Sequence, residues 1–160
     1  MSVLTDEMRR KIRELFPRYP SKQAVTLPAL HMVQDEFRCV PMKAVEEIGE
    51  LLELSPAEVF DTMSFYGFFR EEKDKLGKRR LWVCRSLPCM LKGGEELLAE
   101  VCKKLDVHPG QTTADGQITV EFAECIGACD GAPCILVDDE IIERVTADQA
   151  VAAASKQEKT

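Results

Sequence analysis

The sequence predicts an α+β fold, with a helical bundle in the first half and a small sheet covered by helices in the second. Through residue 70, apolar residues recur at the three- and four-residue spacing of helices. Beyond residue 80, short alternating segments typical of strands appear. Between the two lies EEKDKLGKRR, residues 71–80, an almost wholly charged stretch typical of a linker.

Four helices are expected in the first half, over residues 5–16, 21–37, 42–53 and 55–65. Pro28 interrupts the second pattern, so that this helix either kinks there or begins a new turn. The fourth helix has the clearest start. Ser55 can cap it, Pro56 suits the first helical position, and Glu58 completes a capping box.

The second half alternates between strands and helices. The expected elements are a strand within 79–86, a helix over 93–105, a loop over 108–117, a strand over 118–125, two strands within 134–145, and a helix over 147–154. The two strands turn at Asp138–Asp139, and Thr146 with Gln149 forms a capping box for the last helix. The expected organisation is a helical docking unit over 1–70, a linker over 71–80, a cofactor-binding domain over 81–154 and a disordered tail over 155–160.

Composition excludes several function classes. The 160 residues carry a net charge of -7, which disfavours binding to nucleic acid or to an anionic membrane. No run approaches the roughly 18 apolar residues of a membrane span, and the N-terminus lacks the apolar stretch of a signal peptide. A reducing cytosol is therefore expected, where seven cysteines favour metal or redox chemistry over disulfides.

Two cysteine pairs form the candidate site. Cys84 and Cys89 have C-x4-C spacing, and Cys125 and Cys129 have C-x3-C spacing further along the chain. In each pair, the first cysteine ends an expected strand and the second lies in the loop that follows it. If those strands are neighbours in one sheet, both pairs emerge at the same edge and the four sulfurs can converge.

The spacing favours a [2Fe–2S] cluster without excluding zinc. Such a cluster takes four thiolates, two on each iron, whereas structural zinc sites are commonly built from tighter C-x2-C pairs. A thioredoxin-type dithiol would also need a C-x2-C pair, and the sequence contains none. The other three cysteines are interpreted as small buried apolar residues, and only the third lies near the expected cage: Cys39, Cys102 and Cys134.

These motifs resemble the thioredoxin-like [2Fe–2S] ferredoxin family. The resemblance rests on the two cysteine pairs, on ECIGACDGAP around the second pair, on FYGFF at 65–69 and on HPGQTTADGQ at 108–117. Within the family, the chain resembles the peripheral-arm subunit of respiratory complex I (NADH:quinone oxidoreductase) that partners the flavin- and NADH-binding subunit. The resemblance implies a thioredoxin-like fold for the second half and one [2Fe–2S] cluster, with the ligands Cys84, Cys89, Cys125 and Cys129.

The same resemblance implies a one-electron carrier without a complete active site or catalytic residues of its own. FMN and NADH are expected on the partner flavin subunit, because this chain has no G-x-G-x-x-G loop. Other Fe–S subunits of the peripheral arm are further expected partners. The location implied is the cytoplasmic side, peripheral to the inner membrane through the complex, without a span of its own.

Three alternatives remain open. Equivalent subunits serve NAD-linked formate dehydrogenases and NAD-reducing or bifurcating hydrogenases. A structural zinc module that scaffolds a complex is a reading from a different class, and a free-standing ferredoxin is another. Elsewhere, Trp82 is expected in the core, His31 and His108 at the surface, and SFYGFFR at 64–70 mainly in core packing.

Overall fold

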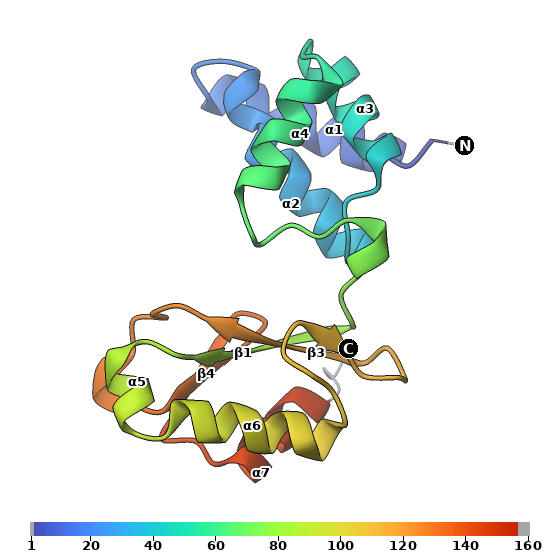
Figure 1. The fold of residues 1–160 in the computed structure, drawn as a ribbon. Coiled ribbons are helices and arrows are strands. Elements are labelled where there is room, and N and C mark those ends of the chain that lie inside the picture. Colours follow the sequence, from blue (N-terminus) through green and yellow to red (C-terminus); the bar gives the residue numbers. More distant parts are fainter. Residues whose placement is uncertain (1, 157–160) are drawn as a thin grey trace. The chain divides into compact units, whose positions relative to one another are not determined.

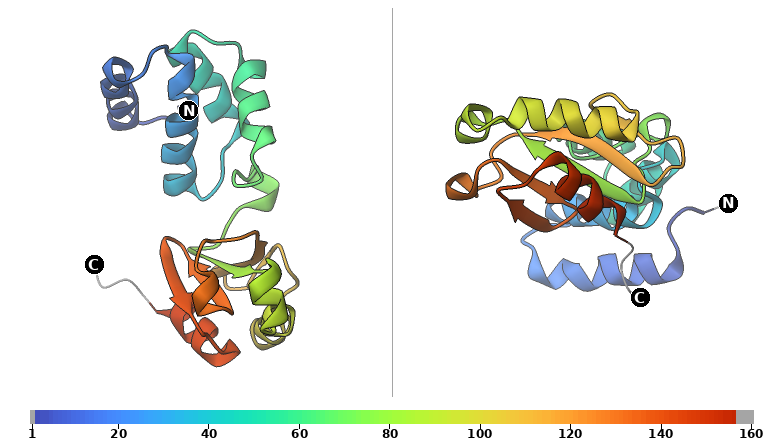
Figure 2. Two further views of the ribbon diagram at one scale, coloured as in Figure 1. Left: turned by 90° about the vertical axis from the view of Figure 1, so that its left-hand side faces the viewer. Right: turned by 90° about the horizontal axis from the view of Figure 1, so that it is seen from below.

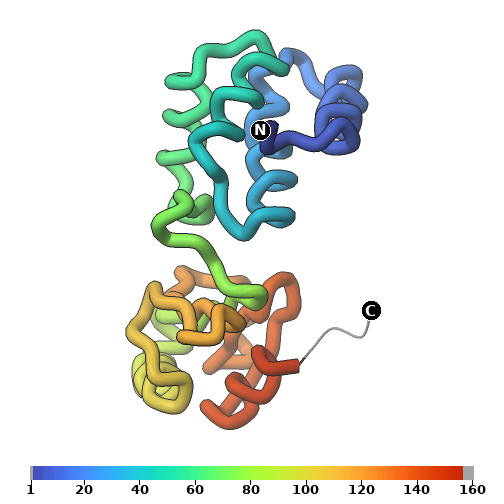
Figure 3. Tube along the Cα trace, turned by 90° about the vertical axis from the view of Figure 1, so that its right-hand side faces the viewer, coloured from blue at the N-terminus to red at the C-terminus, as the bar shows by residue number. Residues whose placement is uncertain are grey.

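The computed structural model describes residues 2–156 and divides into two compact units, Met1–Lys75 and Leu76–Thr160. Each unit is built from one continuous stretch of chain, as the Cα trace shows (Figure 3). No described helix is long and apolar enough to cross a bilayer.

The first unit is a bundle of α-helices with short 3-10 turns (Figure 1). Its elements are α1 (Asp6–Leu15), η1 (Phe16–Arg18), η2 (Gln23–Val25), α2 (Thr26–Phe37), α3 (Met42–Leu52), α4 (Pro56–Phe65) and η3 (Glu72–Asp74). Ile12, Leu30 and Ile48 from the first three helices are fully buried in one apolar core. The four expected helices are therefore confirmed.

Local sequence determines how two of these helices begin. Pro28 lies in the first turn of α2, where its missing N–H leaves no helical bond unmade, so the new-turn interpretation is confirmed. Ser55 caps α4 by accepting from the Glu58 N–H while the Glu58 side chain accepts from the Ser55 N–H. This is the expected capping box.

Glu47 on α3 fixes the start of the chain. Its buried carboxylate accepts the N–H groups of Val3 and Leu4 at 3.0 and 2.9 Å, and the Arg9 guanidinium lies 2.7 Å away. Burial raises the pKa of this carboxyl, but these donors and the Ser2 hydroxyl outweigh it, so the pKa is lowered.

The second unit is a five-stranded sheet with order β2-β3-β1-β4-β5. Its strands are β1 (Arg79–Cys84), β2 (Gln111–Thr112), β3 (Ile118–Ala123), β4 (Cys134–Val137) and β5 (Glu140–Glu143). β1 pairs with β3 in parallel, and the other pairings are antiparallel. Helices α6 (Gly94–Leu105) and α7 (Ala147–Ser155) lie side by side on one face of the sheet (Figures 1 and 2).

Alternation along β1 separates two environments. Leu81 and Val83 point into the core beneath α6 and α7, so Trp82 between them lies on the opposite face. There its indole N–H donates to the Glu121 carboxylate at 2.8 Å, and Arg80 pairs with the same carboxylate. The prediction that Trp82 is a core residue is wrong, because it is half-buried in this polar cluster.

Several boundaries differ from expectation. The expected loop 108–117 contains the short edge strand β2, and Arg79 and Arg80 belong to β1 rather than to the linker. α7 extends to Ser155, and the Lys156 carbonyl accepts from Arg79 at 3.1 Å, so these two residues are not a disordered tail. Residues 157–160, also expected to be disordered, lie outside the described residues.

Candidate metal centre

Parallel pairing brings the two cysteine loops to one edge of the sheet. Cys84 ends β1, and its register partner in β3 is Ala123, shortly before Cys125. The Arg85 N–H then donates to the Ala123 carbonyl at 3.0 Å, which extends the pairing beyond the strands. The expectation that the two strands are neighbours is confirmed.

The loop that follows β1 contains a short helix. Cys89 lies in α5 (Leu87–Leu91), with Pro88 in its first turn, where proline is tolerated. Behind it, Gly94 packs closely against the loop, since a Cβ there would lie 2.9 Å from the carbonyl oxygens of both Cys84 and Cys89. Glycine at this position therefore lets α6 approach the cysteine backbone.

Cys84 is buried, and polar groups of both loops act on its sulfur. Burial alone would raise the pKa of its thiol. The backbone N–H groups of Ser86 and Ile126 and the neighbouring thiols of Cys89 and Cys134 favour the thiolate, and the pKa is lowered on balance. Because Ile126 belongs to the second loop, its influence on Cys84 connects the two halves of the candidate site.

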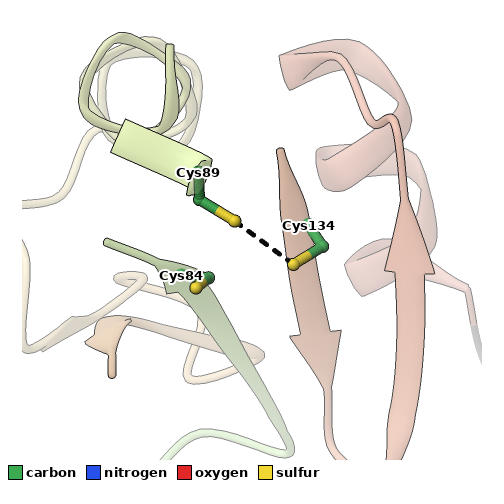
Figure 4. Close-up of side chains that lie close together, drawn as sticks. All are labelled: Cys84, Cys89 and Cys134. Atoms are coloured by element: carbon green, nitrogen blue, oxygen red, sulfur yellow. Dashed lines mark hydrogen bonds between the residues drawn. The ribbon is translucent and has the colours of Figure 1, made fainter. Parts of the chain in front are cut away.

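Cys134 lies beside the first pair. β4 continues the register in which Ile135 faces Val83, and this places Cys134 opposite Cys84. Its sulfur is 3.4 Å from that of Cys89. Figure 4 shows the Cys89 and Cys134 sulfurs pointing toward each other beside Cys84. Burial is the main cause that raises the pKa of Cys89 and of Cys134.

The second pair is exposed. The Cys125 and Cys129 sulfurs lie 3.7 Å apart, and Cys129 opens the turn η4 (Cys129–Gly131). The pKa of Cys129 is raised, first by its hydrogen bond with Cys125 and further by the charges of Cys89 and Cys84. The second pair thus lies within electrostatic reach of the first.

Not all predicted ligands are equally close. Within residues 2–156, the sulfurs that lie mutually within 4.8 Å belong to Cys84, Cys89 and Cys134. Cys134 is buried, as expected, but it is more closely grouped with the first pair than sequence spacing indicated. Cys39 and Cys102 are also buried and lie outside this group, as expected.

The donor set fits a [2Fe–2S] cluster. Two thiol pairs from two adjoining loops match a cofactor that takes two thiolates on each iron. The backbone N–H groups of Ser86 and Ile126 favour the thiolate of Cys84, which is the influence such donors have on sulfurs around clusters. Gly127, with φ of +87°, lets the second loop turn through a conformation that L side chains rarely adopt.

Comparison with known proteins decides the family. Residues 12–157 match the sequence profile of the thioredoxin-like [2Fe-2S] ferredoxins. The chain belongs to this family. The expected thioredoxin-like fold of the second half, with its mixed sheet and covering helices, is confirmed with it.

Its relatives include subunits of respiratory enzymes. The chain is 37% identical to NADH-quinone oxidoreductase subunit 2 of Thermus thermophilus, over 88% of this chain and 78% of that protein. It is 35% identical to a subunit of the NADH-quinone oxidoreductase of Rhizobium meliloti, over 83% of this chain and 78% of that protein. The resemblance predicted from the cysteine motifs is therefore confirmed.

A solved structure of an NAD+-reducing [NiFe]-hydrogenase in the H2-reduced state also matches. The TM-score is 0.70 at 26% identity, and the match covers 81% of this chain. This chain spans only 21% of that hydrogenase chain, so the similarity concerns one part of a much larger polypeptide.

Proposed function

We propose that this chain is an electron-transfer subunit of an NADH:quinone oxidoreductase and that Cys84, Cys89, Cys125 and Cys129 hold one [2Fe–2S] cluster. The observation that carries the proposal is the parallel pairing of β1 with β3, which brings both cysteine pairs to one sheet edge. Membership of the [2Fe-2S] ferredoxin family and the named subunits among the relatives support it.

The residues of such a site have different roles. When bound, the cluster supplies the capacity to accept or give one electron. The buried Cys84 and Cys89 anchor it in the unit, and backbone N–H groups of Ser86 and Ile126 stabilise negative charge at the Cys84 sulfur. The exposed loop of Cys125 and Cys129 leaves the site accessible to a partner that exchanges electrons.

The proposed partner is the flavin- and NADH-binding subunit of the same complex, together with other Fe–S subunits of its peripheral arm. FMN and NADH would bind to that partner, and the assembly would lie on the cytoplasmic side of the inner membrane. The helical unit would provide the docking surface, with 71–80 as the connection to the cluster domain.

Exposed apolar side chains support a docking role. In SFYGFFR, Phe69 is buried, but Phe65 is 80% exposed and Tyr66 is also exposed, so core packing explains only part of this stretch. Near the cysteine site, α5 exposes Leu87 and Leu91. Aromatic and aliphatic groups of this kind are typical anchors of protein interfaces.

Reduction by NADH tests this proposal. The purified chain with its cluster is mixed with NADH, with and without the flavin subunit, and its visible absorbance is followed. We expect dithionite to bleach the chain alone, and NADH to do so only when the flavin subunit is present. Reduction by NADH without the flavin subunit, or failure with it, would contradict the proposed role.

The second candidate is the equivalent subunit of an NAD-reducing hydrogenase. The hydrogenase match at a TM-score of 0.70 favours it. Subunits that co-purify with the chain from its native source distinguish the two, because a hydrogenase contributes a nickel-containing subunit and an NADH:quinone oxidoreductase does not.

A further inference from the structure

Three buried thiols form a group that differs from the proposed cluster cage. Cys84 and Cys89 belong to both sets, whereas Cys134 belongs only to the buried group. Their sulfurs all lie within 4.8 Å of one another, with 3.4 Å between Cys89 and Cys134 (Figure 4). The exposed fractions are 2%, 1% and 1%. This group is assembled without Cys125 or Cys129.

The spacing suits a single thiophilic ion. Zinc–sulfur bonds of about 2.3 Å in a tetrahedral site separate the sulfurs by about 3.8 Å. No two of the sulfurs of Cys84, Cys89 and Cys134 lie more than 4.8 Å apart, a distance that exceeds this separation by about 1 Å. Side-chain rotation therefore suffices to bring them onto one ion. Thiolates favour soft ions such as zinc or cuprous copper over magnesium or calcium.

The surroundings stabilise three thiolates around an ion. The backbone N–H groups of Ser86 and Ile126 favour the thiolate of Cys84, and the N–H of Cys134 favours the thiolate of Cys89. Donors of this kind offset part of the charge of ligand sulfurs. Ile126 and the buried Ala128 pack against the thiols and keep the position away from bulk water.

We propose that the chain without its cluster binds one thiophilic ion through Cys84, Cys89 and Cys134, and that the bound ion prevents cluster assembly. The second part rests on the proposed function, because it requires Cys84 and Cys89 to be cluster ligands. The three sulfurs hold the ion on the buried side, and a single bound water completes its four-coordinate shell.

Zinc binding to the full-length, cluster-free chain tests the site itself. The chain is kept reduced and anaerobic, titrated with Zn2+ against a chromophoric chelator, and examined by X-ray absorption. We expect about one tightly bound zinc with three sulfur ligands. Cys134→Ser should weaken binding by at least about 100-fold, since loss of a ligand exceeds the effect of outer-shell changes.

Two other cysteine-to-serine variants serve as controls for Cys134→Ser. Cys129→Ser removes a proposed cluster ligand, and Cys102→Ser removes a buried thiol outside the group. Both should leave zinc affinity within about threefold of the parent chain. Far-UV circular dichroism checks that each variant is folded. Equal losses in Cys129→Ser and Cys134→Ser, or four sulfurs around zinc, would overturn the proposal, as would an unchanged affinity in Cys134→Ser.

Reconstitution with iron and sulfide separates this proposal from the function. Without zinc, we expect the parent chain and Cys134→Ser to form the cluster equally well. One equivalent of zinc added beforehand should block cluster formation in the parent chain but not in Cys134→Ser. If zinc blocked cluster formation equally in both chains, the proposal that the bound ion prevents cluster assembly would be overturned. Failure of the zinc-free parent chain to form a cluster would instead count against the proposed function, and the zinc titration would still decide on the site.

Discussion

The backbone N–H of Ile126, in one cysteine loop, lies near the sulfur of Cys84 in the other loop and favours its thiolate. Parallel pairing of β1 with β3 makes this approach possible, because both loops leave the sheet at the same edge. The approach therefore links the position of the second cysteine pair to the buried end of the first.

Removing this N–H should lower the reduction potential of the bound cluster. Ile126→Pro eliminates the donor, whereas Ile126→Val keeps it. Reduction adds negative charge, which the donor stabilises, so the proline variant should titrate at a potential lower by roughly 50 mV, or about 1 kcal/mol. An EPR-monitored redox titration measures the shift. Equal midpoints for the proline and valine variants would show that this N–H does not act on the cluster.

Gly94→Ala should destabilise the cysteine loop. The added Cβ would lie 2.9 Å from the carbonyl oxygens of Cys84 and Cys89, so backbone must move. We expect a loss of about 1–3 kcal/mol in the free energy of unfolding, together with a lower cluster yield. Gly67→Ala is the matched control, because its Cβ meets nothing within 4 Å. Urea denaturation measures both, and equal stabilities would contradict the close packing.

Glu47 should make the helical unit sensitive to acid. Its folded pKa lies below the ordinary 4.5, so its stabilisation is complete above pH 4.5 and is lost as the pH falls through the folded pKa. Glu47→Gln should cost about 2 kcal/mol at neutral pH and progressively less in acid. Denaturation at several pH values measures the difference.

The control for this change is Glu46→Gln on the same helix. Glu46 is exposed and pairs with Lys43, so its replacement should change stability by less than about 0.5 kcal/mol. A penalty for Glu47→Gln that persists unchanged in acid would show that the carboxylate charge is not the cause.

The buried pair of Arg80 and Glu121 predicts non-additive mutations. Arg80→Met leaves the Glu121 carboxylate buried without its cation and should cost about 3–5 kcal/mol. The double variant Arg80→Met/Glu121→Leu removes both charges and should be more stable than the single variant. Chemical denaturation of the parent chain, of the single variants Arg80→Met and Glu121→Leu, and of the double variant gives the coupling energy. Additive effects would contradict a desolvated pair.

Sequence patterns predicted the helices and long strands because their signals are local. The Ser55 and Thr146 capping boxes need only residues a turn apart, and both form as predicted. Alternation in β3 likewise depends on the strand alone. The two-residue edge strand β2 escaped prediction because so short a segment has no periodicity of its own.

Pairing between distant segments could not be predicted in the same way. Local periodicity predicts Trp82 in the core, because it does not reveal the order of the strands and hence the position of Glu121 beside Trp82. Cys134 is buried, as predicted. Its contact with Cys89 depends on the antiparallel register of β4 with β1, which cysteine spacing does not encode.

The central claim is that Cys84, Cys89, Cys125 and Cys129 hold a [2Fe–2S] cluster. The most direct measurement is EPR of the dithionite-reduced chain with iron and sulfide counts, repeated for serine variants of these residues and of Cys134. We predict roughly two irons and two sulfides per chain and a rhombic signal that each of the four changes perturbs. A colourless protein with zinc and no sulfide would contradict the claim, as would loss of the signal in Cys134→Ser with retention in Cys129→Ser.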